Sequence, residues 1–242
     1  MKRRGFRCKK EVLEQLRHRY DEITTTDFKG DYLRILENFD IVAEGSLRNI
    51  LYPHYDSRRS ADAAWRTCKG SLYEYAVFKV VNKIIFEQQD LKQKFIALVG
   101  DDALIEYKEQ LVIRNWNEIF PDVDILIIEK ETNDVKAIIS CKTSLRERFT
   151  ETAFWKRELE KRSNTKNIKL IFVTTDKDDE LRVDTNRYIL LHVIDCTFVT
   201  NPHKFQQLMD TFKYRYGKRE DFYELLSKVR NISEIGDYLR SL

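Results

Sequence analysis

Glycine, proline and cysteine are all scarce in this sequence. Seven glycines and three prolines among 242 residues provide no stretch rich in turn-forming residues that could act as a flexible linker, so we expect a chain that is compact throughout. The four cysteines are widely spaced and include no C-x-x-C pair, a pattern that predicts neither a disulfide framework nor a zinc site. We therefore expect reduced thiols at Cys8, Cys68, Cys141 and Cys196.

Long apolar runs and a strong charge excess are also missing. No run of about 18 apolar residues occurs, the length that would indicate a membrane span, and the basic segment 1–16 lacks the continuous apolar stretch of a secretion signal. These absences predict a cytoplasmic protein with no membrane contact. The net charge of +3 does not by itself indicate a nucleic-acid partner, because such binding depends on how charges cluster. No G-x-x-x-x-G-K-[ST] motif is present, which argues against an NTP-driven motor.

The spacing of apolar residues changes along the chain. Helical spacing predicts a helical N-terminal layer over 11–49 and a long helix over 70–89, and it returns after residue 196. Between these regions, short segments rich in Ile, Val and Leu predict strands that are covered on both faces. These segments are 123–129, 137–142, 168–175 and 188–195.

The connections between the predicted strands indicate how they pair. Thr-Asn-Asp turn chemistry in 130–135 favours an antiparallel hairpin, and a predicted helix over about 150–162 suits a crossover to a parallel strand. We therefore expect an α/β fold with a central mixed β-sheet flanked by helices, and with helical segments at both ends of the chain. Region 1–69 is expected to pack as a helical N-terminal part on a core formed by 70–242, in one compact unit.

Charged residues mark the ends of the first two predicted strands. Asp124 directly precedes the apolar run 125–128, and Lys142 closes the second apolar strand. Carboxylates are ligands for Mg²⁺, and a cation beside them can act on an attacking water or on a phosphate. Either residue could also be structural, because an acid can solubilise the start of a strand and a lysine can extend along a sheet edge to solvent. Asp122 is the alternative to Asp124 as the metal ligand, because alternate residues of a strand face the same side.

The same residues resemble a known nuclease family. Pro121-Asp122 before an apolar strand, followed by Ser140-Cys141-Lys142 at the end of the next strand, is similar to the signature of the PD-(D/E)xK nucleases. The chain departs from the common pattern at Ser140, where an acid is usual. This departure is a feature of the type II restriction endonucleases that read CCGG, in which the following helix supplies the missing acid, and within this subgroup the chain resembles the BsaWI type. The resemblance implies a restriction-endonuclease-like core and dependence on Mg²⁺.

Three glutamates are candidates for the remaining acidic roles that the resemblance implies. Glu158 lies sixteen residues after Lys142 and Glu151 nine residues after it. The spacing in the subgroup favours Glu158 as the second metal ligand, with Glu151 as the alternative. Glu74, in the predicted helix ahead of the sheet, matches a further glutamate of the family. An acid in the first turns of a helix is also favoured by the helix dipole alone.

The charged run after Lys142 has the chemistry needed to read DNA. Arg146, Glu147 and Arg148 match the R-(D/E)-R reading motif of the subgroup. Arginine can donate two hydrogen bonds to guanine O6 and N7, and glutamate can accept one from cytosine N4, so the run suits a CCGG core. Such a run can also be an ordinary solvated charge cluster.

Together these features predict a prokaryotic type II restriction endonuclease that makes Mg²⁺-dependent double-strand breaks at a short palindromic site with a CCGG-like core. A palindrome presents two equivalent half-sites, so a homodimer is expected on double-stranded DNA, with a higher assembly on DNA left open. The resemblance also implies a partner DNA methyltransferase. Two alternatives remain: a DNA repair or recombination nuclease of the same fold, and a non-cleaving, sequence-specific DNA-binding protein on a nuclease scaffold.

Overall fold

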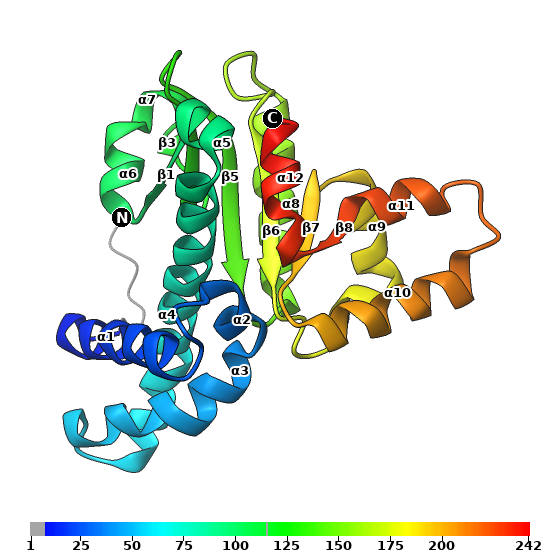
Figure 1. Cartoon of the computed structure of the whole chain (residues 1–242). Coiled ribbons are helices and arrows are strands. Elements are labelled where there is room, and N and C mark those ends of the chain that lie inside the picture. Colours follow the sequence, from blue (N-terminus) through cyan, green and yellow to red (C-terminus); the bar gives the residue numbers. More distant parts are fainter. Residues whose placement is uncertain (1–7, 115) are drawn as a thin grey trace.

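Six strands form a mixed β-sheet in the order β1-β4-β5-β6-β7-β8 (Figure 1). The computed structural model describes residues 8–114 and 116–242, except for the side chains of residues 101–102 and 146–148. β4 pairs antiparallel with β1 and with β5, whereas β5, β6, β7 and β8 run parallel to one another. The mixed sheet and the antiparallel hairpin that the sequence predicts are therefore confirmed. The strands are β1 (Phe95–Val99), β4 (Ile125–Glu129), β5 (Asp134–Lys142), β6 (Lys169–Thr174), β7 (Cys196–Val199) and β8 (Val229–Asn231), and a separate two-stranded sheet joins β2 (Ile113–Arg114) to β3 (Glu118–Ile119).

One face of the sheet is covered by the helices of the N-terminal region and by the last helix of the chain. The long helix α4 (Arg58–Glu87) packs against β1 and β5 and is capped at its N-terminus by Ser57, whose hydroxyl accepts a hydrogen bond from the Ser60 amide at 3.2 Å. Its buried side chains follow one stripe that includes Leu72 and Ala76, as expected for an amphipathic helix. The other elements on this side are α1 (Lys10–Thr26), α2 (Tyr32–Glu37), α3 (Phe39–Val42), the π-helix η1 (Ala43–Leu47), the 3-10 helix η2 (Arg48–His54), α5 (Gln89–Lys94), the 3-10 helix η4 (Ile232–Glu234) and α12 (Ile235–Arg240).

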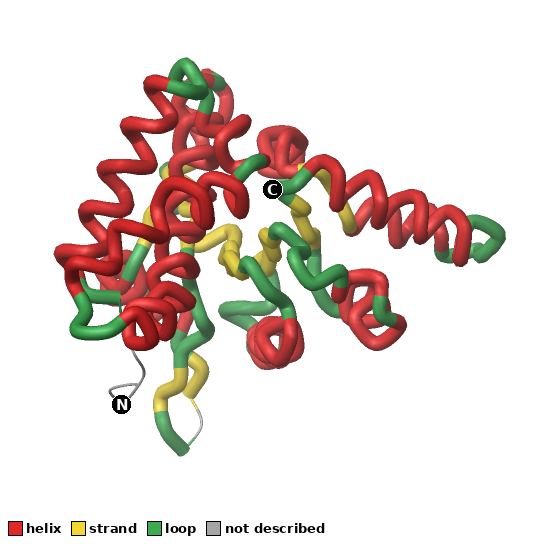
Figure 2. The backbone as a smooth tube through the Cα atoms, turned by 90° about the horizontal axis from the view of Figure 1, so that it is seen from below, coloured by secondary structure: helices red, strands yellow, loops and turns green. Residues whose placement is uncertain are grey.

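The opposite face is covered by helices that follow the strands. These are α6 (Asp101–Glu106), α7 (Lys108–Leu111), α8 (Arg146–Glu160), the 3-10 helix η3 (Glu180–Arg182), α9 (Asp184–His192), α10 (Pro202–Tyr216) and α11 (Phe222–Lys228). Figure 2 shows the strands between the two helical layers. Within β4, Ile125 and Ile127 belong to the hydrophobic core on the side of α4. Leu126 and Ile128 belong to the core on the opposite side, with α8 and α9. This burial on both faces explains why the strands are almost continuously apolar.

Several predicted elements differ from the observed ones in type or in bounds. The segment 188–195 is not a strand: most of it lies in α9, and the strand of this part of the sheet is β7. A short apolar run does not distinguish a buried strand from a buried helix turn, which explains the error. Helices α4 and α8 both begin earlier than predicted, at Arg58 and Arg146. The position between residues 69 and 70 lies inside α4, so the N-terminal region and the core share one helix.

The prediction of four reduced thiols is wrong for two of them. Cys8 and Cys68 form a disulfide although 60 residues separate them in the sequence, because the fold places their Cα atoms 4.8 Å apart. Cys141 and Cys196 are free and buried. Among the helices of residues 8–114 and 116–242, none has the length and the apolar character needed to cross a membrane.

Candidate active site

The hairpin of β4 and β5 brings the predicted Asp and Lys together. Its register pairs Ile125 with Ile139, and in an antiparallel pair each step back along one strand is a step forward along the other. The chain before β4 therefore lies beside the end of β5. There the ammonium of Lys142 donates to Asp124 Oδ2 at 2.7 Å and lies 3.2 Å from Asp122 Oδ2. The Cys141 amide donates to the same Asp124 oxygen at 2.6 Å.

This ion pair is almost completely removed from solvent. The side chains of Lys142 and Asp124 are 5% and 7% exposed, and that of Asp122 is 26% exposed. Burial raises the pKa of Asp124, and Lys142 offsets only part of that effect. Burial also lowers the pKa of Lys142, but the carboxylates of Asp124 and Asp122 outweigh it and hold this pKa above its ordinary value. Lys142 is therefore a fixed positive charge at neutral pH.

Helix α4 contributes Glu74 to the same place. Glu74 lines a cavity of about 140 Å³ together with Lys142 and the two residues that follow it, Thr143 and Ser144. Its carboxylate also helps to raise the pKa of Lys142. Four of the residues predicted for the site are thus gathered at one end of the sheet: Asp122, Asp124, Lys142 and Glu74.

The carboxylates here suit a small hard cation. Within the described part of the chain, no group of three or more His, Cys, Asp or Glu side chains is placed to hold a metal ion. A complete protein cage is not what Mg²⁺ requires, because this ion is usually held by one or two carboxylates together with water and phosphate oxygens. Asp124 and Asp122, which share the ammonium of Lys142, match that smaller set of donors.

Glu158 is not brought to this cluster. Helix α8 begins at Arg146 and advances about 1.5 Å per residue, so Glu158 lies about 18 Å further along the helix axis. The neighbouring Lys156 donates to the carbonyl of Ile168, just before the start of β6, whereas Lys142 pairs with the last residue of that strand. Glu158 instead forms an ion pair with Lys161.

The other predicted residues on α8 lie closer to the site. Glu151 is exposed in the second turn of the helix. The backbone of residues 146–148 forms the first turn of α8, whereas the side chains of Arg146, Glu147 and Arg148 lie outside the described residues. The proposed reading run therefore begins only a few residues after Lys142, at the end of the sheet that carries the ion pair.

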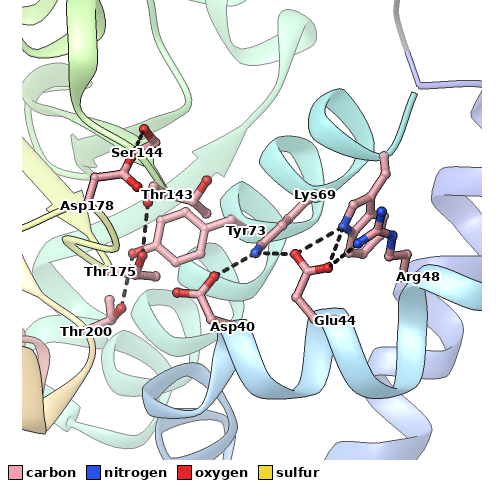
Figure 3. A network of polar contacts seen from close by, with 11 residues as sticks. Asp40, Glu44, Arg48, Lys69, Tyr73, Thr143, Ser144, Thr175, Asp178 and Thr200 are labelled. Carbon is pink, nitrogen blue, oxygen red and sulfur yellow. Dashed lines mark hydrogen bonds and ion pairs between the residues drawn. The ribbon is translucent and has the colours of Figure 1, made fainter. Parts of the chain in front are cut away.

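Sequence reasoning missed the residues that hold the site in place. The Thr143 carbonyl accepts a hydrogen bond from the Thr175 hydroxyl at 3.0 Å, and the Ser144 hydroxyl donates to Asp178 at 2.6 Å (Figure 3). These contacts fasten the segment after Lys142 to the loop after β6. The available signal was the position of polar residues directly after parallel strands, where neighbouring strand ends meet.

A second set of polar contacts fastens α4 in its place. The hydroxyls of Tyr73 and Thr200 are hydrogen-bonded at 3.2 Å, which joins α4 to the end of β7. One turn earlier on α4, the buried ammonium of Lys69 lies 2.7 Å from Asp40 and 2.9 Å from Glu44 (Figure 3). Two residues shortly before Glu74 in the sequence are therefore held by neighbouring elements, and these contacts anchor the part of α4 that carries Glu74.

Comparison with known proteins identifies the family of this chain. The family described as BsaWI restriction endonuclease type 2 matches residues 103–225, about half of the chain. The chain belongs to this family. The part that matches the BsaWI family includes Asp122, Asp124, Lys142 and α8. It begins after α4, so Glu74 lies outside the match.

Two curated relatives carry related names. The chain is 32% identical over 138 residues to MjaVIP of Methanocaldococcus jannaschii, which is named as a type II restriction enzyme, and the match covers 52% of this chain and 58% of the relative. It is 41% identical over 63 residues to HpyAORF263P of Helicobacter pylori, also named as a type II restriction enzyme, with 26% of this chain and 33% of the relative covered. The chain thus spans little more than half of the first relative and a third of the second.

A solved structure shows the same fold over nearly the whole chain. The complex of restriction endonuclease PspGI with substrate DNA matches with a TM-score of 0.60 and covers 96% of this chain and 91% of that chain. The sequence identity is 17%, so the match concerns the fold. It confirms the expected restriction-endonuclease-like core, including the N-terminal helices that lie outside the BsaWI family match.

Proposed function

We propose that this chain is a type II restriction endonuclease of the PD-(D/E)xK class. It would make Mg²⁺-dependent double-strand breaks at a short palindromic DNA site with a CCGG-like core. The observation that carries the proposal is the contact of Lys142 Nζ with Asp124 Oδ2 at 2.7 Å and with Asp122 Oδ2 at 3.2 Å. Membership of the BsaWI family supports the same reading.

The charges at the end of the sheet suit phosphodiester hydrolysis. Lys142, protonated at neutral pH, would stabilise the negative charge that develops on the phosphate in the transition state. Asp124 and Asp122 would hold Mg²⁺, and Glu74 would orient a water molecule in the cavity that it shares with Lys142. When bound, Mg²⁺ polarises a phosphoryl oxygen and lowers the pKa of a bound water.

Ser140 occupies the position where the nuclease family usually has an acid, so a carboxylate from another element would have to replace that acid. Ser140 is buried, and its hydroxyl has no hydrogen-bond partner among the described residues. A serine cannot supply the negative charge of a carboxylate ligand. Of the two glutamates considered to replace it, Glu151 lies near the Lys142 end of α8, and we therefore propose Glu151 rather than Glu158.

The reading residues and the assembly are parts of the same proposal. Arg146, Glu147 and Arg148 would read the G·C pairs from the first turn of α8, next to the point of cleavage. Two copies of the chain would act as a homodimer on the two half-sites of the palindrome. A partner DNA methyltransferase would then protect the same site in the cytoplasm of the host.

The test is cleavage of a long duplex DNA of known sequence, with Mg²⁺, with Ca²⁺ and with a chelator, followed by mapping of the fragment ends. We expect discrete ends at one palindrome in Mg²⁺ only. Lys142→Ala should lower the cleavage rate by about 100-fold or more. Lys136→Ala is the matched control, because Lys136 lies on the same strand but at its other end, where it pairs with Glu129.

Each other result selects another function. Ragged cutting without a shared sequence would favour a repair or recombination nuclease. Specific binding without cleavage in any divalent ion would favour a DNA-binding protein on a nuclease scaffold. Full activity of Lys142→Ala would remove the assignment of the catalytic site.

A further inference from the structure

A glycine lies in the middle of the long helix α4 for no evident structural reason. Glycine inside a helix lowers helix stability relative to alanine, because it loses more conformational freedom on folding. At Gly70 a Cβ atom would meet no described atom within 4 Å, and the backbone has no positive φ that would favour glycine. Neither packing nor backbone conformation therefore requires glycine at this position.

Gly70 lies between two charged residues on one face of the helix. Arg66, Gly70 and Glu74 are spaced four residues apart, and residues with this spacing are neighbours on one helix face. All three line the cavity of about 140 Å³ that also contains Lys142. They also line an adjoining cavity of about 160 Å³, together with Thr67 and Ser71. The absence of a side chain at Gly70 leaves a hollow that is continuous with the candidate active site.

The side chain of Arg66 is placed at this hollow. It is exposed, and it forms no hydrogen bond or ion pair with any residue that the structure describes. Other cations of α4 are differently placed: Lys69 pairs with Asp40, and Lys79 pairs with Asp21. A guanidinium group presents a planar set of donors that matches the oxygens of a phosphate.

We propose that the Arg66-Gly70-Glu74 face of α4 binds the DNA backbone beside the cleaved phosphodiester. Arg66 would bind a phosphate that flanks the one at Lys142, and the bare backbone at Gly70 would let the sugar-phosphate chain approach the helix. Thr67 and Ser71 line the same hollow, and their hydroxyls are of the type that contacts phosphate oxygens. This inference rests on the proposed function, because it deepens the account of the same site.

The glycine variants separate a role in binding from a role in folding. Gly70→Ala should raise the ratio of folded to unfolded protein by about two- to fivefold, because alanine is the better helix former. The same change should weaken DNA binding, and the larger Gly70→Leu should lower both binding and cleavage by about tenfold or more, because misplacing a substrate by about 1 Å can cost up to 100-fold. Gly45→Ala is the matched control, because a Cβ atom at Gly45 also meets no described atom within 4 Å and Gly45 lines neither cavity. Circular dichroism melting verifies that each variant is folded.

The arginine variant tests the phosphate contact directly. Affinity for a duplex that contains the mapped site is measured in Ca²⁺ at several salt concentrations. Each phosphate contact contributes about 0.9 to the slope of log affinity against log salt concentration, so Arg66→Ala should reduce the slope by about 0.9 per subunit. Arg157→Ala removes the same charge from the last turns of α8, and it should leave the slope unchanged.

The two proposals fail in different ways. An unchanged salt slope in Arg66→Ala, together with wild-type binding by Gly70→Leu, overturns this inference even when the wild-type protein cleaves and Lys142→Ala does not. If the wild-type protein never cleaves in Mg²⁺, the proposed function fails. In that case the affinity is measured on a duplex of arbitrary sequence, and because this measurement requires no cleavage, the salt slope still decides whether Arg66 contacts a phosphate.

Discussion

Replacing Lys142 with methionine should destabilise the protein as well as inactivate it. The change removes the ammonium from a pair whose side chains are only 5% and 7% exposed, and it leaves Asp124 in a nearly dry site with a hydrogen bond from the Cys141 amide. Removing one partner of a buried ion pair costs about 3 to 5 kcal/mol. The loss has an upper limit, because Asp124 can take up a proton instead. At pH 7, about three pH units above the ordinary pKa of Asp, protonation costs about 4 kcal/mol. We therefore expect the free energy of unfolding to fall by about 3 kcal/mol.

This loss should depend on pH in a definite direction. Without Lys142, the pKa of Asp124 in the folded protein is raised further above its unfolded value, because burial is no longer offset by a positive charge. The folded state then binds more protons than the unfolded state, so stability is lost as the pH rises from about 4 toward the folded pKa. The deficit relative to the wild type should shrink once the pH falls below the folded pKa of Asp124 in the variant, by at most about 1.4 kcal/mol for each pH unit.

The assay is urea unfolding followed by circular dichroism between pH 5 and pH 8, in the presence of a chelator. Lys136→Met is the control, because the Lys136 side chain is 31% exposed at the other end of β5 and exposed ion pairs contribute little. The double variant Lys142→Met/Asp124→Leu should regain most of the lost stability, since an apolar pair can replace a buried ion pair, and it should remain inactive. If Lys142→Met has the same urea midpoint of unfolding as the wild type at every pH, the reasoning is refuted.

Three further predictions concern residues away from the ion pair. Cys8→Ala should lower the free energy of unfolding by up to about 4 kcal/mol, because the disulfide closes a loop of 60 residues, and reduction of the wild type should have the same effect in urea unfolding. Asp176→Asn should stabilise the protein by about 1 to 3 kcal/mol at pH 7, because burial raises the pKa of Asp176 to about 6 and the wild type loses stability as the pH rises from about 4 to 6. A calorimetric pH series in which both proteins keep the same slope would contradict this. Lys156→Met should cost about 1.5 to 3 kcal/mol, because it removes one of the two lysines that pair with Asp195 and leaves Lys169 as the other, while the cleavage rate of the folded variant stays unchanged.

Local sequence determined the part of the site that two adjacent strands carry. Residues 125–129 and 134–142 are short apolar runs joined by a tight turn, and a short hairpin connection sets the register of its strands. The register places Asp124 and Asp122 beside Lys142 without any contribution from distant segments. The mixed sheet followed in the same way, because a hairpin and a helical crossover dictate opposite strand directions.

Only the tertiary structure decided which distant residues join that pair. Arg66 and Glu74 reach the cavity because the apolar stripe of α4 packs on β1 and β5. Glu158 has a suitable spacing from Lys142 in the sequence, yet the direction of α8 carries it away from the site. The segment 188–195 and the Cys8–Cys68 disulfide were misjudged for a related reason. Local residue patterns record which faces are apolar, whereas packing between elements far apart in the chain decides what those faces meet.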